Sequence, residues 1–172
     1  KSFVIGFHGS YLPAQGVEYI LEAAKLLKDK PVIFSLLGNG QEYGKIRDTA
    51  NKLSLTNVKF LSKTPYEKLP DFVSQCDIYL GGHFGLTPKA FRVIPNKVFE
   101  AIAMRKPVII GRSPATEELF TDNIDCLMVK HGDPSSLVDA IKLLVEDQEL
   151  REKISGNAFG FLVYYVRHKE IA

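Results

Sequence analysis

Two cations and one carboxylate lie close together in segment 92–100, where the sequence predicts the start of a helix. Asn96 follows a proline and marks the helix entrance, so Arg92 and Lys97 lie near an N-terminus that carries partial positive charge. A lysine in the first turn opposes the helix dipole, and a bound anion such as phosphate would give it a role. Glu100 could accept hydrogen bonds from two hydroxyl groups, as a ribose diol offers. The alternative is a salt bridge from Glu100 to Lys97 or Arg92, or a solvated helix face.

Two glycine-bearing loops follow predicted strands. Gly9 comes directly after the first strand and Gly16 directly before the first helix, and Gly38-Asn39-Gly40 follow the second strand. Glycine lets the backbone approach a ligand closely, and the free amides of a helix start favour an anion. The alternative is that these glycines only serve turns. No Gly-x-Gly-x-x-Gly opens the first helix, which argues against a nicotinamide dinucleotide without excluding it.

The remaining polar candidates favour structural roles. His8 and His83 are predicted to be hydrogen-bonded structural histidines, and His131 and His168 are predicted to lie on the surface. Packing roles are expected for Tyr66, Tyr164 and Tyr165. The sequence contains no His, Cys or carboxylate cluster with metal-ligand spacing and no nucleophile elbow. It therefore predicts neither a metal site nor a nucleophilic triad.

The elements that must hold these residues alternate along the chain. Short apolar runs predict strands at 3–8, 31–37, 57–61, 77–80, 107–110 and 126–129. Amphipathic stretches predict helices at 17–28, 41–53, 65–75, 96–104, 116–120, 134–147 and 148–166. This alternation indicates one Rossmann-like three-layer α/β/α domain over residues 1–172, with a mostly parallel sheet. In such sheets ligands bind beyond the carboxyl ends of the strands, where the glycine loops and segment 92–100 lie.

Helix ends and one long loop carry further predictions. Thr64 is expected to cap the third helix and Asp133 the sixth. Gly156 and Gly160 are expected weak points of the last helix. The longest predicted loop, 81–95, exceeds the usual connection length, and loops of this kind are often functional.

Composition limits the class of protein. The 172 residues suit one domain, and 45% hydrophobic with 24% charged residues suit a packed core. The net charge of +2 is spread along the chain, which does not indicate nucleic-acid binding. Cys76 and Cys126 are expected to be buried, reduced thiols. The sequence shows no signal peptide and no apolar run near the ~20 residues of a membrane span, and we expect a cytoplasmic protein. A chain that opens inside a strand suggests a domain cut from a longer protein.

In these segments the sequence resembles the C-terminal domain of family 4 glycosyltransferases of the GT-B fold, over roughly residues 4–158. The matching segments, in the family's order, are 9–24, 36–42, 57–61 with 69–70, 97–109, and 127–129 with 132–134 and Leu137. The ordered set, rather than any one segment, carries the resemblance.

The resemblance implies a retaining, metal-independent glycosyltransferase of which this chain is the donor-binding half. It implies that Glu100 holds the ribose hydroxyls, that Asn96 and Lys97 hold the diphosphate, and that Gly9 lets the backbone approach phosphate or sugar. The loop 62–64 would lie near the base. The donor-binding residues expected from it are Gly9, Ser10, Gly38, Ser62, Lys63, Asn96, Lys97 and Glu100.

Some positions depart from the family pattern. The family carries two glutamates with seven residues between them, and Arg92 stands at the first of these positions. Its first loop presents an arginine or lysine near the positions of Ser10 and Gln15. We expect Arg92 to pair with phosphate bidentately and, as a catalytic residue together with Lys97, to stabilise the leaving diphosphate. The alternative is a catalytically inactive nucleotide-sugar-binding or interaction module.

The resemblance also sets the expected partners. These are a sugar nucleotide, an N-terminal domain that brings the acceptor site and the family's catalytic histidine, and a glycan or lipid-linked acceptor. Neither a cofactor nor nucleic acid is expected. The full-length protein would be a hexosyltransferase, cytoplasmic and peripheral to the membrane, and the isolated domain would be inactive. The base, the sugar and the acceptor stay open.

Overall fold

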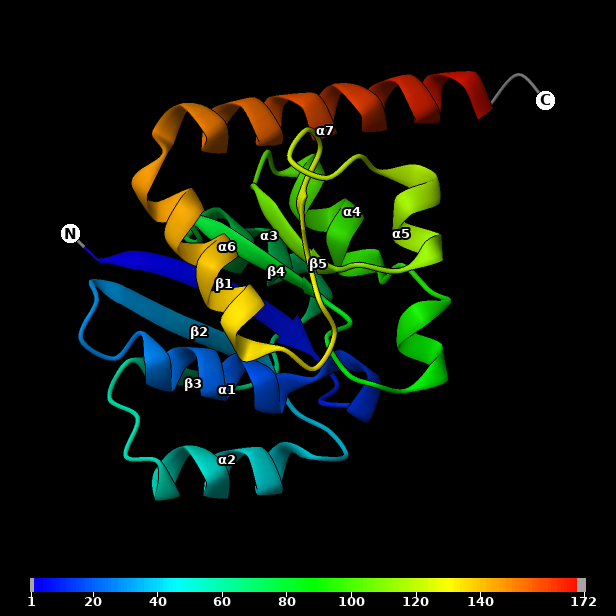
Figure 1. The fold of residues 1–172 in the computed structure, drawn as a ribbon. Coiled ribbons are helices and arrows are strands. Elements are labelled where there is room, and N and C mark those ends of the chain that lie inside the picture. Colours follow the sequence, from blue (N-terminus) through cyan, green and yellow to red (C-terminus); the bar gives the residue numbers. More distant parts are fainter. Residues whose placement is uncertain (1, 170–172) are drawn as a thin grey trace.

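Six parallel strands form one sheet, in the order β3-β2-β1-β4-β5-β6, in the computed structural model, which describes residues 2–169 (Figure 1). The strands are β1 (Phe3–Gly9), β2 (Val32–Gly38), β3 (Val58–Leu61), β4 (Ile78–Gly82), β5 (Val108–Gly111) and β6 (Leu127–Val129). The predicted fold class is confirmed, and residues 1 and 170–172 of the predicted domain lie outside the described residues. The strand order runs outward from β1 in both directions, and ligands of such sheets bind at this switch point.

Helices cover both faces of the sheet (Figure 1). One face carries α1 (Val17–Leu26), α2 (Tyr43–Lys52) and α6 (Pro134–Glu146), and the other carries α3 (Leu69–Ser74), α4 (Asn96–Ala103) and α7 (Gln148–Lys169). The short helix α5 (Pro114–Leu119) follows β5. Each face of the sheet has its own hydrophobic core. Because strand side chains alternate in direction, Ile109 enters the core under α1, α2 and α6, whereas Val108 and Ile110 enter the core under α3, α4 and α7. Both faces of a parallel sheet must be covered in this way.

The helix α4 begins at Asn96, as predicted, and its packing fixes the direction of its polar side chains. It buries Val98 and Ile102 completely against the sheet, and each large aliphatic side chain buried in this way contributes about 1.5–3 kcal/mol. With its rotation fixed, α4 presents Lys97 and Glu100 toward β1. Lys97 and Glu100 therefore lie beside the end of β1, where the first glycine loop begins.

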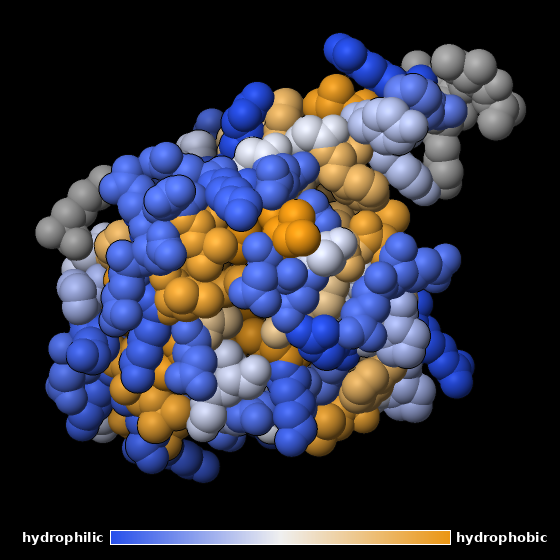
Figure 2. All heavy atoms as spheres, turned by 45° about the horizontal axis from the view of Figure 1, so that its top comes forward, coloured by the Kyte–Doolittle hydropathy of each residue, from blue (hydrophilic) through white to orange (hydrophobic). Residues whose placement is uncertain are grey.

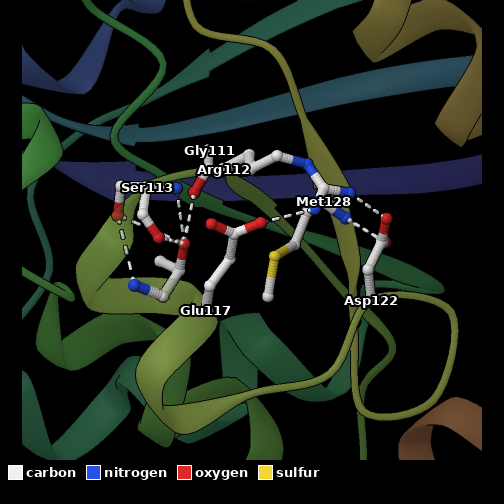
Figure 3. Close-up of polar contacts among 7 residues, drawn as sticks. Gly111, Arg112, Ser113, Glu117, Asp122 and Met128 are labelled. Carbon is white, nitrogen blue, oxygen red and sulfur yellow. Dashed lines mark hydrogen bonds and ion pairs between the residues drawn. The ribbon is translucent and has the colours of Figure 1, made fainter.

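The turns that follow β5 and β6 are held by polar side chains. Ser113 and Thr116 form a reciprocal capping box at the start of α5. Arg112 joins that helix to the next loop by pairing with both Glu117 and Asp122, as Figure 3 shows. The predicted cap at Asp133 is confirmed, because its carboxylate accepts hydrogen bonds from two backbone amides of α6.

The prediction that Thr64 caps a helix starting at residue 65 is wrong. A 3₁₀ turn, η2 (Tyr66–Lys68), comes first, and α3 starts only at Leu69. Pro70 lacks an N–H group and therefore fits the first turn of a helix, where amides have no intrahelical acceptor. This start leaves Thr64 and Tyr66 in the loop at the carboxyl edge of the sheet.

The last helix forms where it is predicted, whereas the long loop differs from its prediction. α7 runs without a break through Gly156 and Gly160, because its apolar residues Ile154 and Ala158 are buried against the domain and offset the weak helix propensity of glycine. The loop 81–95 is shorter than predicted, since β4 extends to Gly82 and a 3₁₀ helix, η3 (Pro88–Phe91), interrupts it.

The two cysteines are buried free thiols, as predicted. Burial raises the pKa of Cys76 and of Cys126 to about 12, so both carry their protons at neutral pH. Of the helices within residues 2–169, none has the length and apolar character that crossing a membrane requires.

Candidate functional site

A hollow of about 270 Å³ opens at the carboxyl ends of β1 and β2, beside the switch point of the sheet. Its lining residues are His8, Gly9, Ser10, Leu37, Gly38, Asn39, Lys63, Thr64, Tyr66 and Leu69. Four of the predicted donor-binding residues lie in this lining, namely Gly9, Ser10, Gly38 and Lys63. Strands far apart in sequence therefore bring these residues to one place.

Glycines let the loops after β1 and β2 approach each other. Gly38 has a φ of +127°, and a Cβ atom there would lie 2.1 Å from the carbonyl oxygen of Gly9. Gly40 has a φ of +153°, and its Cβ would lie 1.8 Å from the oxygen of Ser10. Only glycine tolerates both the backbone angle and the contact. These residues serve tight loop geometry, and the same geometry leaves backbone at the edge of the hollow.

Lys97 lies behind Gly9 with its charged end unpaired. Its side chain is 5% exposed, its Nζ has no hydrogen-bond partner among the described residues, and Nζ lies 4.2 Å from the ring centroid of Phe7. A Cβ atom on Gly9 would lie 2.9 Å from this Nζ. Burial lowers the pKa of Lys97 to about 7, and the charge of Glu100 opposes that shift. A buried ammonium group without a partner is costly, and an anion at Gly9 would supply one.

Each carboxylate oxygen of Glu100 has a side-chain neighbour, and neither neighbour is Lys97 or Arg92. The hydroxyl of Tyr66 donates to Oε1 at 3.1 Å, and Nε2 of His8 lies 3.1 Å from Oε2. Oε2 is buried and accepts no well-aligned hydrogen bond from residues 2–169, so it keeps acceptor capacity. Within that range, neither Lys97 nor Arg92 forms an ion pair with Glu100.

Tyr66 and His8 are functional neighbours that sequence reasoning assigned to other roles. Packing was expected for Tyr66, but its side chain is 70% exposed in the η2 turn, and its hydrogen bond to Glu100 raises its pKa. His8 is hydrogen-bonded, as predicted, because its Nδ1 pairs with the hydroxyl of Tyr79. It also lines the hollow. Burial and the nearby charge of Lys97 lower the pKa of His8 to about 4, so its ring is neutral at pH 7.

Five predicted site residues lie outside the lining of this hollow, and three of them are exposed. Arg92 is exposed at the end of η3, Asn96 is exposed at the first position of α4, and Ser62 is exposed just before the lining residue Lys63. Their assigned roles remain predictions. Lys97 and Glu100 do not line the hollow either, but each contacts or closely approaches a residue that does.

The surface position predicted for His131 is wrong, since its side chain is only 6% exposed. Its Nδ1 lies 3.0 Å from the carbonyl oxygen of Gly85, and the ring of Phe91 stacks on it at 4.2 Å. Gly132 donates to the carbonyl of Phe84, which folds this turn back onto the loop after β4. His83 is a hydrogen-bonded structural histidine, as predicted, with Nδ1 3.1 Å from the oxygen of Val93.

The part of the chain that the structure describes holds no group of three or more His, Cys, Asp or Glu side chains that could bind a metal ion. The polar groups at and beside the hollow include the exposed ammonium of Lys63, the buried ammonium of Lys97, the carboxylate of Glu100 and the backbone of two loops. This set can bind an anion and a pair of hydroxyl groups next to each other.

Residues 1–160 match the family described as glycosyl transferases group 1. The chain belongs to this family. It is 26% identical over 155 residues to the glycosyltransferase MJ1178 of Methanocaldococcus jannaschii, covering 90% of this chain and 42% of that protein. The chain thus spans less than half the length of the curated relatives it matches.

Solved structures share the fold of this glycosyltransferase domain. HepE of Anabaena, crystallised in complex with UDP-glucose, superposes with a TM-score of 0.82 at 23% identity, covering 94% of this chain and 44% of HepE. The C-terminal domain of a group 1 glycosyl transferase, LpcC from Francisella tularensis, superposes with a TM-score of 0.78 at 20% identity, covering 94% of this chain and 85% of that domain. These neighbours support the Rossmann-like half of the GT-B fold.

Proposed function

We propose that this chain is the donor-binding half of a retaining glycosyltransferase that moves a sugar from a nucleoside-diphosphate sugar to a glycan or lipid-linked acceptor. The observation that carries the proposal is the unpaired, buried Nζ of Lys97 behind Gly9, one helical turn from the carboxylate of Glu100. A nucleoside diphosphate carries an anionic diphosphate next to a ribose diol, which match the ammonium of Lys97 and the carboxylate of Glu100. The UDP-glucose complex of HepE, a protein of the same fold, supports this choice of ligand.

Each predicted residue has a role in this proposal. Lys97, with the free amides at the start of α4 and the nearby Asn96, binds the diphosphate over Gly9, and Glu100 accepts hydrogen bonds from the ribose. The backbone at Gly38 and Ser10 borders the sugar and phosphates, and Ser62 with Lys63 lies near the base. When the bond to the sugar breaks, Lys97 and Arg92 stabilise the charge that develops on the leaving diphosphate. Arg92 acts from the exposed end of η3.

The remainder of the enzyme lies outside this chain in the same proposal. An N-terminal domain supplies the acceptor site and completes the cleft, so the domain alone binds donor without transferring a hexose. The charge on the diphosphate is met by side chains and amides, which makes the reaction independent of metal. The full-length protein works in the cytoplasm, peripheral to a membrane that holds the acceptor.

Calorimetric titration without added metal tests the donor site. The chain is titrated with UDP, GDP and ADP and then with their sugar conjugates. We expect one nucleotide to bind selectively and Glu100→Ala to weaken it about tenfold or more, since a hydrogen bond to a charged group is worth about 1.5–3 kcal/mol. Glu117→Ala, which removes an exposed carboxylate outside the hollow, is the matched control. Unchanged affinity of Glu100→Ala would refute the assignment of the ribose site.

A catalytically inactive nucleotide-sugar-binding module is the second candidate. The observations that favour it are Arg92, Ser10 and Gln15, which stand where the family pattern has other chemistry. The full-length protein decides between the candidates when it is incubated with the nucleotide sugar that binds. Turnover would exclude the inactive module, and tight binding without transfer to any acceptor would favour it.

A further inference from the structure

The carboxylate of Glu100 is contacted by side chains from two separate elements. Tyr66 reaches Oε1 from the η2 turn, and His8 reaches Oε2 from the end of β1. The Tyr66 side chain is exposed, whereas the His8 side chain is mostly buried. His8 is therefore the more constrained of the two contacts, and its orientation decides what Oε2 faces.

A glycine on β1 gives His8 its own partner. Gly6 pairs with Tyr79 across the β1–β4 register, and a Cβ atom on Gly6 would lie 2.2 Å from Sγ of Cys76 and 3.2 Å from Cδ2 of Tyr79. The missing side chain therefore leaves room for the Tyr79 ring beside β1. Tyr79 is fully buried, and its hydroxyl meets Nδ1 of His8. A buried phenol needs such a partner, because an unpaired hydroxyl in the core is costly.

The two contacts of His8 fix the position of its ring proton. If Nδ1 carried the proton, the lone pair of Nε2 would face the carboxylate of Glu100 at 3.1 Å, which is repulsive. If Nε2 carries the proton, its N–H points to the carboxylate side and Nδ1 accepts from the Tyr79 hydroxyl. Both contacts are then favourable. Burial lowers the pKa of His8 to about 4, so a doubly protonated ring does not form at pH 7.

We propose that His8, with its tautomer fixed by Tyr79, is a positioning residue that orients the Glu100 carboxylate, and that the preference of the site for ribose over 2′-deoxyribose depends on this contact. The inference rests on the proposed function, because it assigns the ligand of Glu100 to the ribose. His8 need not touch the nucleotide for this effect. It acts by anchoring the buried Oε2, which fixes the direction in which the carboxylate presents its other oxygen to a ribose hydroxyl.

Paired titrations test the positioning role. The chain is titrated with its preferred nucleoside diphosphate and with the 2′-deoxy form. Wild type should bind the ribose form about tenfold more tightly, the effect of one hydrogen bond to a charged group. His8→Phe should lose most of this preference while its affinity for the deoxy form stays within about twofold. In His8→Gln the side-chain amide can reach the place of Nε2, and part of the preference should return.

Equal losses for the two nucleotides in His8→Phe, or an unchanged preference, would overturn the proposal, because a purely structural defect does not distinguish a single hydroxyl. His168→Phe is the matched control, since it makes the same change at an exposed position on α7 that does not line the hollow. Tyr66→Phe removes the other contact to Glu100 and measures how much of the preference depends on Oε1.

Nitrogen NMR of the His8 ring gives a readout that needs no nucleotide. Wild type should show a proton on Nε2 and none on Nδ1 from pH 6 to pH 8. Tyr79→Phe should show a mixture of tautomers. A proton on Nδ1 in wild type would overturn the positioning role. If the ring has the expected tautomer but the full-length protein binds no nucleoside diphosphate, the proposed function itself has failed, and the ribose preference fails with it.

Discussion

Lys97 is the residue in which the requirements of folding and of binding conflict most directly. Its ammonium is buried without a hydrogen-bond partner among the described residues, so it lowers the free energy of unfolding when no ligand is bound. In the proposed function, the anion that Lys97 binds offsets this cost. Its position over the Phe7 ring recovers part of the cost, because an aromatic face attracts a cation.

Replacing Lys97 by methionine should therefore separate stability from affinity. Lys97→Met keeps an unbranched side chain against the Phe7 ring, and we expect a melting temperature equal to or above that of wild type. The affinity for the nucleoside diphosphate should fall about 30-fold or more, the effect of losing a charge-assisted contact of about 2–5 kcal/mol. Thermal melts and calorimetry measure the two effects. Lys25→Met, at an exposed position of α1, is the control.

The lowered pKa of Lys97 makes the same comparison depend on pH. Its pKa is about 7 in the folded protein, and an unfolded lysine has a pKa of about 10.4. Between these values the unfolded state binds more protons, so this residue makes the unfolding free energy of wild type rise with pH. The stability advantage of Lys97→Met should be largest below pH 7 and should shrink toward pH 10. Denaturant melts of both proteins measure it, and an advantage that is constant with pH would contradict the assignment.

Among the secondary-structure elements, the end of β2 packs closely against the backbone at the end of β1, beside the hollow. Gly38→Ala would force a Cβ atom into the backbone of Gly9 at a positive φ, and we expect a loss of about 2 kcal/mol or more. Gly156→Ala is the matched control, because a Cβ there meets nothing in α7 and alanine favours a helix by about 1 kcal/mol. Chemical denaturation should thus show opposite signs for the same substitution. A neutral Gly38→Ala would mean that the β1 and β2 loops are less close than described.

The N-terminal cap of α6 is expected to stabilise the fold without affecting nucleotide affinity. The Asp133 carboxylate accepts from two amides of the first turn, and Asp133→Ala should lower the unfolding free energy by about 1 kcal/mol. Nucleotide affinity should not change, since the hollow lies at β1 and β2. A denaturation curve and one titration are sufficient to check both statements, and weakened binding would indicate a coupling that the contacts do not contain.

Taken together, the described residues form a single sheet whose strands contribute to both cores, so we expect one cooperative unfolding transition. A nucleoside diphosphate that binds only the folded state should raise its stability by about 2.7 kcal/mol when present at 100 times its dissociation constant. Calorimetric scans with and without the nucleotide measure the shift. Two separated transitions would contradict the view that both cores depend on the same strands.

Most of the sheet and helix order follows from the sequence, because a parallel sheet covered on both faces requires apolar strands alternating with amphipathic helices. What depends on tertiary contacts was missed. His131 is buried only because its turn folds back on the loop after β4. In the site, loop position predicted the four residues Gly9, Ser10, Gly38 and Lys63, which line the hollow.

The arrangement around Glu100 could not be predicted, because it depends on register. His8, Tyr66 and Tyr79 reach one another from β1, η2 and β4, and no local pattern in the sequence connects them. A glycine inside a strand was the available signal, since it marks a place where another group approaches the backbone.

The space at Gly6 also has an evolutionary consequence. Because Sγ of Cys76 fills the place where a Cβ on Gly6 would lie, an alanine at position 6 is compatible with the fold only if residue 76 becomes smaller in the same lineage. Tyr79 limits that exchange, since its ring lies beside the same gap and must still reach His8. In a family alignment, positions 6 and 76 should therefore vary together, and both should stay fixed wherever position 8 is a histidine.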